Sequence, residues 1–362
     1  MPDTPMLAIE NVSQEEVIFD SRRVPCGLEQ FPDSPARAIR EAGGEIILFA
    51  TFETNWFMAG PDWASLRPTC VSAGRGAENS DPEATDDKFW IQALYSKDGR
   101  DVLALGSHEY LGTRHPGQCV VTEPEGQRPP CWFSSITQYV SRGDARHFKP
   151  AAAAPIVAAP QESYSPRSAR RVGFFTASNI IADRDHLYVL VYGEGMAGQP
   201  QGNCLFRTER SGGASRWLGW DGTDFTADLS KLGAAPNKAC RPVEGLHHEA
   251  RSLVRHRESG KFVTIFTSRD RSTTGVFYSV SDDMKHWGPQ KLLLEAPLTR
   301  QEPGCEPVYR YPSLIDHDAP EQAFESVGNR AFLYSVKIIL DGCRQSGRLI
   351  TRIPVTITTS GT

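Results

Sequence analysis

An all-β fold is predicted by the composition of the chain and by one stretch that holds every element of a four-stranded sheet. The 362 residues include 31 Gly, 26 Pro and 7 Trp, and 39% are hydrophobic, which suits a loop-rich β protein with a substantial core. Residues 248–295 contain four short runs rich in apolar and β-branched residues, separated by turns of Gly, Asp and Ser. Four consecutive antiparallel strands of this kind are typical of one propeller blade.

The four runs in this stretch span residues 250–256, 261–268, 275–281 and 290–295. Between the last two lies the sequence 281–287, in which Ser and Asp side chains can bond backbone amides in a tight turn. We expect Trp287 at the end of this turn to pack back onto the sheet. Residues 141–148 have the same outline, an Asp-bearing turn before an aromatic residue.

Short segments similar to the first two runs recur along the chain, each a strand, a Gly or Asp turn and an apolar strand. They span residues 36–51, 90–107, 177–193, 250–268 and 312–337. Their starts lie about 50 to 90 residues apart, wider than the ~40–50 of regular propeller repeats, so loops must be inserted. These repeats predict a five-bladed propeller of four-stranded antiparallel blades. The alternative is a β-sandwich whose hairpins are alike by chance.

Two terminal segments and one biased segment complete this organisation. Residues 15–21 and 348–358 are plausible strands, and one terminus can complete a blade that the other begins. Residues 150–171 are rich in Ala and Pro like a linker, but repeats continue on both sides. We therefore expect one domain over 1–362, with 150–171 as a surface excursion.

The net charge and the hydropathy of the sequence argue against two classes of partner, nucleic acids and membranes. The formal net charge of −5 gives no overall attraction to nucleic acid, so no nucleic-acid partner is predicted. No apolar run approaches the ~18 residues of a membrane helix, so membrane insertion is not expected. Residues 1–3 begin without a basic or apolar leader region.

The eight cysteines indicate whether the protein works in an oxidising or a reducing cellular compartment. They lie in or beside apparent loops, and none forms a CxxC pair of the kind found in zinc ribbons. An even number favours four disulfides, and hence a secreted or periplasmic protein whose leader has been removed. Pairing of neighbours such as Cys119 and Cys131 is the simplest of the many connectivities. The alternative is eight buried free thiols in a cytosolic protein.

Candidate functional residues lie where each repeat enters its first strand, because propellers place function on loops at one end of the channel. Charged, polar and aromatic side chains gather at these entrances: Asp33, Arg37, Trp90, Asn179, His248, Glu249, Arg251, Arg310 and Tyr311. Each has a purely structural alternative as a turn former, an ion-pair partner or a core residue. Their recurrence at equivalent positions favours a functional role.

At these residues the chain resembles the five-bladed propeller glycoside hydrolases of the arabinanase, levansucrase and invertase group. The resemblance rests on Asp33 ahead of a hairpin ending in residues 48–50, on Glu249 ahead of one ending in 265–267, and on the turn 281–287. It implies Asp33 as base or nucleophile and Glu249 as acid. In that group an Asp of the third blade orients the acid, whereas this chain has Ser178 and Asn179 there.

Glycosidic cleavage needs one carboxylic acid to protonate the leaving oxygen and one carboxylate to activate water or attack directly. We expect Asp33 to stay ionised beside Arg37. Glu249 suits the acid only if His248 and Arg251 point away from it. Residues 107–115 form a second polar cluster on an apparent loop, in which Glu109 is an alternative acid. His108 and His115 are seven residues apart, weak support for a metal site, and no metal or cofactor is predicted.

The sequence therefore predicts a glycoside hydrolase that cleaves a furanoside or small pyranoside linkage of a polysaccharide with Asp33 and Glu249 or Glu109. Sugar faces would stack on Trp56, Trp90, Trp132 and Tyr311. Substrate contacts are predicted for Arg37, Trp90, His108, Asn179, His248, Arg251 and Tyr311. One alternative is a propeller that binds a glycan or protein without cleaving it. Another is a sialidase-like hydrolase of an acidic sugar, suggested by Arg37, Arg114 and Arg251, although six blades would then be expected.

Overall fold

A computed structural model describes residues 4–24, 26, 31–50, 52–121, 129–152, 155–210, 216–234, 237–299 and 305–359. The described chain is almost entirely β-structure. Its helical residues lie in three single-turn 3-10 segments: η1 (Val12–Gln14), η2 (Ser21–Arg23) and η3 (Gly112–Arg114). Within these ranges no helix has the length and apolar character needed to cross a membrane. The prediction of an all-β protein is confirmed.

The first sheet is a simple meander. It has the strand order β3-β4-β5-β6, formed by β3 (Arg37–Arg40), β4 (Ile46–Phe49), β5 (Trp56–Gly60) and β6 (Arg67–Ser72). All four residues of β4 are buried, because Ile46 and Leu48 pack into one hydrophobic cluster and Ile47 and Phe49 into another on the opposite face.

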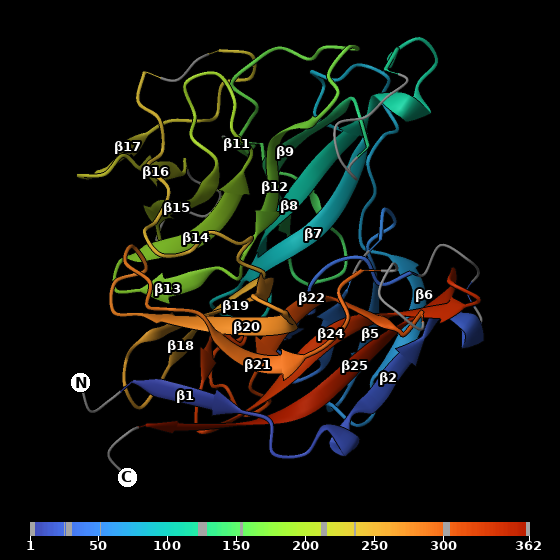
Figure 1. Cartoon of the computed structure of the whole chain (residues 1–362), viewed down its shortest axis with the longest axis vertical. Coiled ribbons are helices and arrows are strands. Elements are labelled where there is room, and N and C mark those ends of the chain that lie inside the picture. The colour runs from blue at the N-terminus through green and yellow to red at the C-terminus, as the bar shows by residue number, and fades with distance from the viewer. Residues whose placement is uncertain are drawn as a thin grey trace.

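The largest sheet contains two meanders that are joined side by side (Figure 1). The first comprises β7 (Lys88–Tyr95), β8 (Val102–Leu111) and β9 (Trp132–Ser141), with β10 (Lys149–Pro150) and β11 (Ile156–Ala158) on its edge. The second comprises β12 (Arg171–Ala177), β13 (Ile181–Asp183), β14 (His186–Gly193), β15 (Gly202–Glu209), β16 (Leu218–Trp220) and β17 (Phe225–Ala227). A short parallel pairing of β9 with β12 connects them.

The stretch that predicted the fold forms its own sheet. Its strand order is β21-β20-β19-β18, from β18 (Ser252–His256), β19 (Phe262–Asp270), β20 (Thr273–Ser281) and β21 (Lys291–Glu295). The short strand β23 (Ser326–Val327) adds in parallel to β18. The prediction of four antiparallel strands here is confirmed.

The two ends of the chain share the last sheet. It contains β22 (Val308–Ile315), β24 (Arg330–Asp341), β25 (Arg344–Thr359), β1 (Pro5–Ala8) and β2 (Glu16–Asp20). Both β1 and β2 pair antiparallel with β25, and Figure 1 shows the blue N-terminal strand beside the red C-terminal one. The N-terminal segment thus completes a sheet built by the C-terminal one, as predicted.

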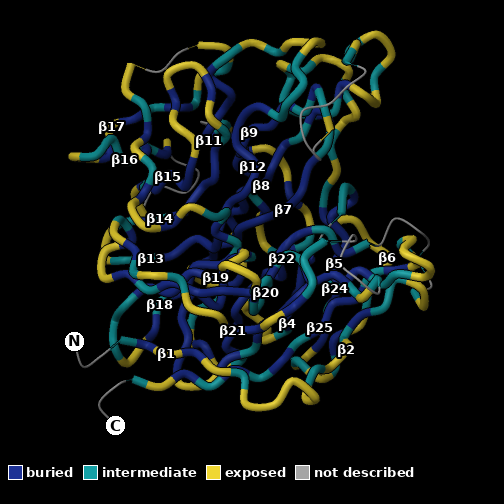
Figure 2. The backbone as a smooth tube through the Cα atoms, in the orientation of Figure 1, coloured by how far each residue is buried: buried dark blue, intermediate teal, exposed yellow. Residues whose placement is uncertain are grey.

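Each of the five repeated segments contains an antiparallel strand pair: β3–β4, β7–β8, β13–β14, β18–β19 and β22–β24. In the third, β12, which ends where the segment begins, pairs with the other edge of β14. The curled sheets that extend these pairs give the molecule a propeller-like arrangement. Their inner strands are buried, whereas exposed residues concentrate on the peripheral loops (Figure 2). The Ala- and Pro-rich segment begins by pairing β10 and β11 with β9, so part of it is edge strand.

Arg37 ties four of these pairs together at the centre. Its guanidinium donates to the carbonyl oxygens of Ala36, Gln92 and Arg251 at 2.9, 2.6 and 2.6 Å, and to Ser313 Oγ at 3.0 Å. It is fully buried and has no carboxylate partner among the described residues, and burial lowers its pKa to about 9. Backbone oxygens therefore replace water around a cation that stays charged at neutral pH.

The predicted Asp and Ser turn is confirmed. Ser281 Oγ accepts the amides of Asp283 and Met284, and Asp283 Oδ1 accepts those of Lys285 and His286. Trp287 is buried and donates its indole N–H to the carbonyl of Met284. The second predicted turn is built alike, since Asp144 Oδ1 accepts the amide of Arg146 and Phe148 is buried.

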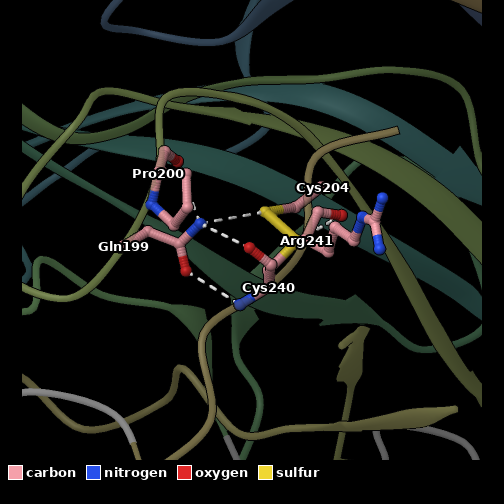
Figure 3. The surroundings of a disulfide bond; sticks show 5 residues. All are labelled: Gln199, Pro200, Cys204, Cys240 and Arg241. Atoms are coloured by element: carbon pink, nitrogen blue, oxygen red, sulfur yellow. Dashed lines mark hydrogen bonds between the residues drawn. A yellow bond between two sulfur atoms is a disulfide. The ribbon is translucent and has the colours of Figure 1, made fainter. Parts of the chain in front are cut away.

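All eight cysteines form disulfides: Cys26–Cys70, Cys119–Cys131, Cys204–Cys240 and Cys305–Cys343. The predicted pairing of Cys119 with Cys131 is confirmed, although Cys70 and Cys204 lie within strands rather than in loops. The side chain of Gln199 makes two hydrogen bonds beside the Cys204–Cys240 bridge (Figure 3). Its Nε2 donates to the carbonyl oxygen of Cys240 at 3.1 Å, and its Oε1 accepts the amide of Cys240 at 2.9 Å.

Candidate active site

One cavity of about 180 Å³ collects side chains from every one of the repeated strand pairs or the segments beside them. Its lining residues are Asp33, Phe52, Glu53, Trp90, Gln92, Glu109, Leu111, Arg114, Trp132, Arg171, Phe175, Thr176, Glu249, Arg251 and Tyr311. Arg37 lies directly behind its wall, because the carbonyls of Gln92 and Arg251 accept from Arg37. Four carboxyl groups and three guanidinium groups thus meet around one small space.

Asp33 lies in the loop before β3 and is held from two sides. Arg348 of β25 forms an ion pair with its Oδ1, and the hydroxyl of Tyr311 donates to the same oxygen at 3.1 Å. Burial raises the pKa of Asp33 above its ordinary value, and Arg348 and Tyr311 oppose that rise. A cation and a hydroxyl donor on one oxygen favour the ionised carboxylate.

Tyr311 reaches Asp33 through an unusual backbone. It has a φ of 51°, in the left-handed region that side chains larger than Gly rarely adopt, and the register of β22 with β24 shifts between Arg310 and Ser313. The guanidinium of Arg251 lies 5.2 Å from the Tyr311 ring centroid. Strain of this kind persists where the surroundings fix a side chain in a functional position.

Glu109 lines the same cavity as Asp33 but has different partners. It lies near the end of β8, and the hydroxyl of Ser107 donates to its Oε1 at 2.8 Å. Burial raises its pKa to about 7; Ser107 opposes that rise, the charge of Asp33 adds to it, and Arg171 and Trp132 oppose it. A carboxyl group with this pKa keeps its proton in mildly acidic solution, as a general acid must.

Glu249 is surrounded by cations. Arg171 donates to its Oε1 at 2.6 Å, Arg251 forms an ion pair with its Oε2, and Thr176 Oγ1 donates to Oε2 at 3.0 Å. Arg171 also pairs with Glu194. Two guanidinium groups on one carboxylate favour its ionised form, so the sequence-based condition that Arg251 point away from Glu249 is not met.

Glu53 is the fourth carboxylate that lines the cavity. Glu53 forms an ion pair with Arg114 and lies 3.3 Å from Lys88 Nζ. The apolar walls are aromatic: Trp90 packs edge-on against Phe52, and Trp132 against Phe175, with ring centroids 6.4 and 5.1 Å apart. Such walls beside a few fixed polar groups are common in binding sites for small ligands.

The structure brings most of the predicted site residues into this cavity. Asp33, Glu109, Glu249, Trp90, Arg251 and Tyr311 all line it, as does Trp132. The prediction that Asp33 is paired with Arg37 is wrong, because its cation is Arg348.

Five other residues predicted to contact substrate do not line this cavity. Arg37 faces the centre of the molecule, and Asn179 Oδ1 accepts Ser252 Oγ and the amide of Leu253. His248 contacts Ser268 Oγ at 2.8 Å, and Trp56 is buried with its indole N–H donated to the carbonyl of Phe31. These polar groups are used within the protein.

The geometry of the strand places the side chain of His108 away from the cavity. Residues 107–111 were predicted as a loop but belong to β8, in which successive side chains point to opposite faces. Because Glu109 faces the cavity, its neighbour His108 faces the interior, where burial lowers its pKa to about 3. No group of three or more His, Cys, Asp or Glu side chains suited to a metal ion occurs in the described ranges.

Sequence analysis missed Glu53, Arg171 and Arg348. Arg171 ends the segment that looked like a linker, and Arg348 lies in the segment interpreted only as a closing strand. A signal was present for Arg171, because the charged pair Arg170-Arg171 directly precedes an apolar run.

Comparison with solved structures identifies similar folds. A glycosyl hydrolase from Bacteroides ovatus has a TM-score of 0.51 at 9% identity, over 97% of this chain and 94% of that one. An endo-1,5-alpha-L-arabinanase from Thermotoga petrophila has a TM-score of 0.50 at 12% identity, over 89% of this chain and 71% of that one. No protein-family model matches the chain, and neither does any curated protein. At such identities the likeness is one of fold, and the predicted resemblance to propeller glycoside hydrolases is confirmed at that level.

Proposed function

We propose that the protein is a glycoside hydrolase in which Asp33 and Glu109 form the catalytic pair. The supporting observation is the contrast of two carboxyl groups in one cavity: Asp33 is paired with Arg348, whereas Glu109 forms no ion pair with any described residue and desolvation raises its pKa to about 7. Pairs of carboxyl groups whose surroundings separate their roles in this way perform acid and base chemistry at one site.

In this mechanism Glu109 transfers its proton to the glycosidic oxygen while the carbon–oxygen bond breaks and its electron pair stays on that oxygen. Asp33 either removes a proton from the attacking water or attacks the anomeric carbon itself. The aromatic rings of Trp90 and Trp132 offer faces for the sugar. Tyr311 and Arg348 keep Asp33 oriented.

The size of the cavity bears on the substrate. Its volume of about 180 Å³ is below the ~300–1,000 Å³ of sites for larger ligands, which favours one furanose or small pyranose unit. The three cavity guanidinium groups, Arg114, Arg171 and Arg251, support an acidic sugar as a second candidate substrate, although each already pairs with a carboxylate.

We also propose the number of blades and the cellular location of the protein. Five antiparallel pairs, each extended by outer strands, support five blades in one domain. Four disulfides are consistent with an extracellular or periplasmic protein, because such bonds persist in oxidising compartments.

The test is a screen of the purified protein against neutral and acidic glycans and against nitrophenyl furanosides and pyranosides. One or more should be hydrolysed, and Asp33→Asn should remove turnover while the melting temperature and glycan binding stay nearly unchanged. Binding without turnover of any substrate by the unmutated protein would favour the non-catalytic alternative. Full activity in Asp33→Asn would end the assignment of Asp33.

A further inference from the structure

Trp132 places the hydrogen-bond donor of its indole ring beside Glu109. The two residues lie on adjacent antiparallel strands, where Glu109 is opposite Ser134 and Leu111 is opposite Trp132. Trp132 is therefore the diagonal neighbour of Glu109 on the same face, a separation that long aromatic side chains bridge. Both side chains line the cavity.

The indole nitrogen of Trp132 is buried and has no acceptor at ordinary hydrogen-bond geometry within the described part of the chain, although the indole is close enough to Glu109 to lower the pKa of that carboxyl. A buried N–H without an acceptor costs free energy, so its retention calls for an explanation. The neighbouring carboxyl supplies one: while protonated, Glu109 has a weaker demand for donors than its carboxylate has. Hydrogen bonds at catalytic groups are often long in the free enzyme and tighten as charge develops.

On this basis, which rests on the proposed function, we infer that Trp132 is a positioning residue for the acid step, with its indole N–H stabilising the Glu109 carboxylate formed when the proton leaves. Ser107 Oγ, at 2.8 Å from Glu109 Oε1, is the donor already in place. The proton passes from Glu109 to the leaving oxygen, and two neutral donors then hold the negative charge. The indole ring can contact the sugar at the same time.

The test variant is Trp132→Phe, which keeps an aromatic ring against Phe175 and removes the N–H together with part of the ring. On a substrate with a poor leaving group, such as an alkyl glycoside, kcat should fall about tenfold, the loss expected for one hydrogen bond to a charged group. On a dinitrophenyl glycoside, whose leaving group needs no proton, kcat should change little. A matched Trp90→Phe variant, which alters the other cavity tryptophan, should affect both substrates alike.

Equal losses on both substrates in Trp132→Phe would overturn the inference, since a packing role does not distinguish leaving groups. A second measurement does not depend on turnover: NMR titration of the Glu109 side-chain carboxyl should show its midpoint about one pH unit higher in Trp132→Phe than in the unmutated protein. An unchanged midpoint would also overturn it. If no substrate is cleaved, the proposed function fails, while the titration still decides the role of the indole N–H.

Discussion

Glu109 and Glu249 are the same residue type in the same cavity, and they differ in what surrounds them. Glu109 lies on a strand inside a sheet, where the neutral hydroxyl of Ser107 donates a hydrogen bond to it. Glu249 lies in the loop before β18 and contacts Arg171, Arg251 and Thr176. Burial with a neutral donor favours the protonated form, whereas guanidinium groups favour the ionised form. In the proposed mechanism, the neighbouring charges rather than the position in the cavity distinguish the acid from the other glutamate.

The largest expected difference between the two is in turnover. Glu109→Gln should lower kcat on unactivated substrates by about 10³-fold, within the range for loss of a general acid. Glu249→Gln should act mainly on KM, because it loosens Arg171 and Arg251 rather than removing the proton donor. Steady-state kinetics of both variants would check this, and a larger kcat loss in Glu249→Gln would reverse the assignment.

The pH dependence of the unmutated enzyme should have two limbs. Activity should fall about tenfold per pH unit above about 7, as Glu109 loses its proton, and also at acidic pH, as Asp33 gains one above its ordinary pKa. The basic limb should disappear in Glu109→Gln when an activated substrate is used. A basic limb that persists there would belong to another group.

Substitutions of the two glutamates should also have different effects on the free energy of unfolding. The folded pKa of Glu109, about 7, exceeds its ordinary 4.5, so its contribution to the free energy of unfolding falls as pH rises from about 4.5 to 7. Glu109→Gln should therefore be more stable than the unmutated protein at pH 8 by about 3 kcal/mol, and not at pH 4. Glu249→Gln should be less stable by about 2 kcal/mol at pH 8, because Arg251 loses its carboxylate.

Urea unfolding at both pH values would measure these differences. Each variant is compared with the unmutated protein because Glu325, which burial also gives a pKa of about 7, adds its own pH dependence to both. Equal effects of the two substitutions would contradict the contrast between their surroundings.

The smallest effect is expected from Arg251→Lys. The ammonium retains the charge beside Glu249 but loses the planar contact with Tyr311, a change of about 1 kcal/mol or less in the free energy of unfolding. The same unfolding measurement would detect it. Arg251→Met, which removes the charge as well, is the matched comparison and should cost more.

Much of the fold was predicted from patterns of neighbouring residues in the sequence. The hairpins, the Asp turns and the shared terminal sheet all follow from strand composition, turn residues and the need to cover an edge, which are local properties. The entrances of the strands also located Asp33, Glu249 and Tyr311 correctly in one cavity.

Partner choice could not be predicted in the same way. Asp33 was matched with Arg37, its neighbour in sequence, but the cation it contacts is Arg348, more than 300 residues away. Arg37 itself turns to the centre because carbonyl oxygens of several strand pairs converge there. Which of two adjacent side chains faces the cavity, as for His108 and Glu109, depended on whether residues 107–111 form a strand or a loop. Ion-pair partners distant in sequence, and the direction in which a side chain points, are set only when the sheets pack together.

The place of Arg348 in β25 links the proposed catalytic site to the assembly of the fold. β25 docks against β24 on one side and against both N-terminal strands on the other. The guanidinium that orients Asp33 consequently reaches it only after the two ends of the chain have met. Recovery of turnover during refolding would then report closure of the molecule itself, whereas fluorescence or circular dichroism would also register sheets that had formed before the ends came together.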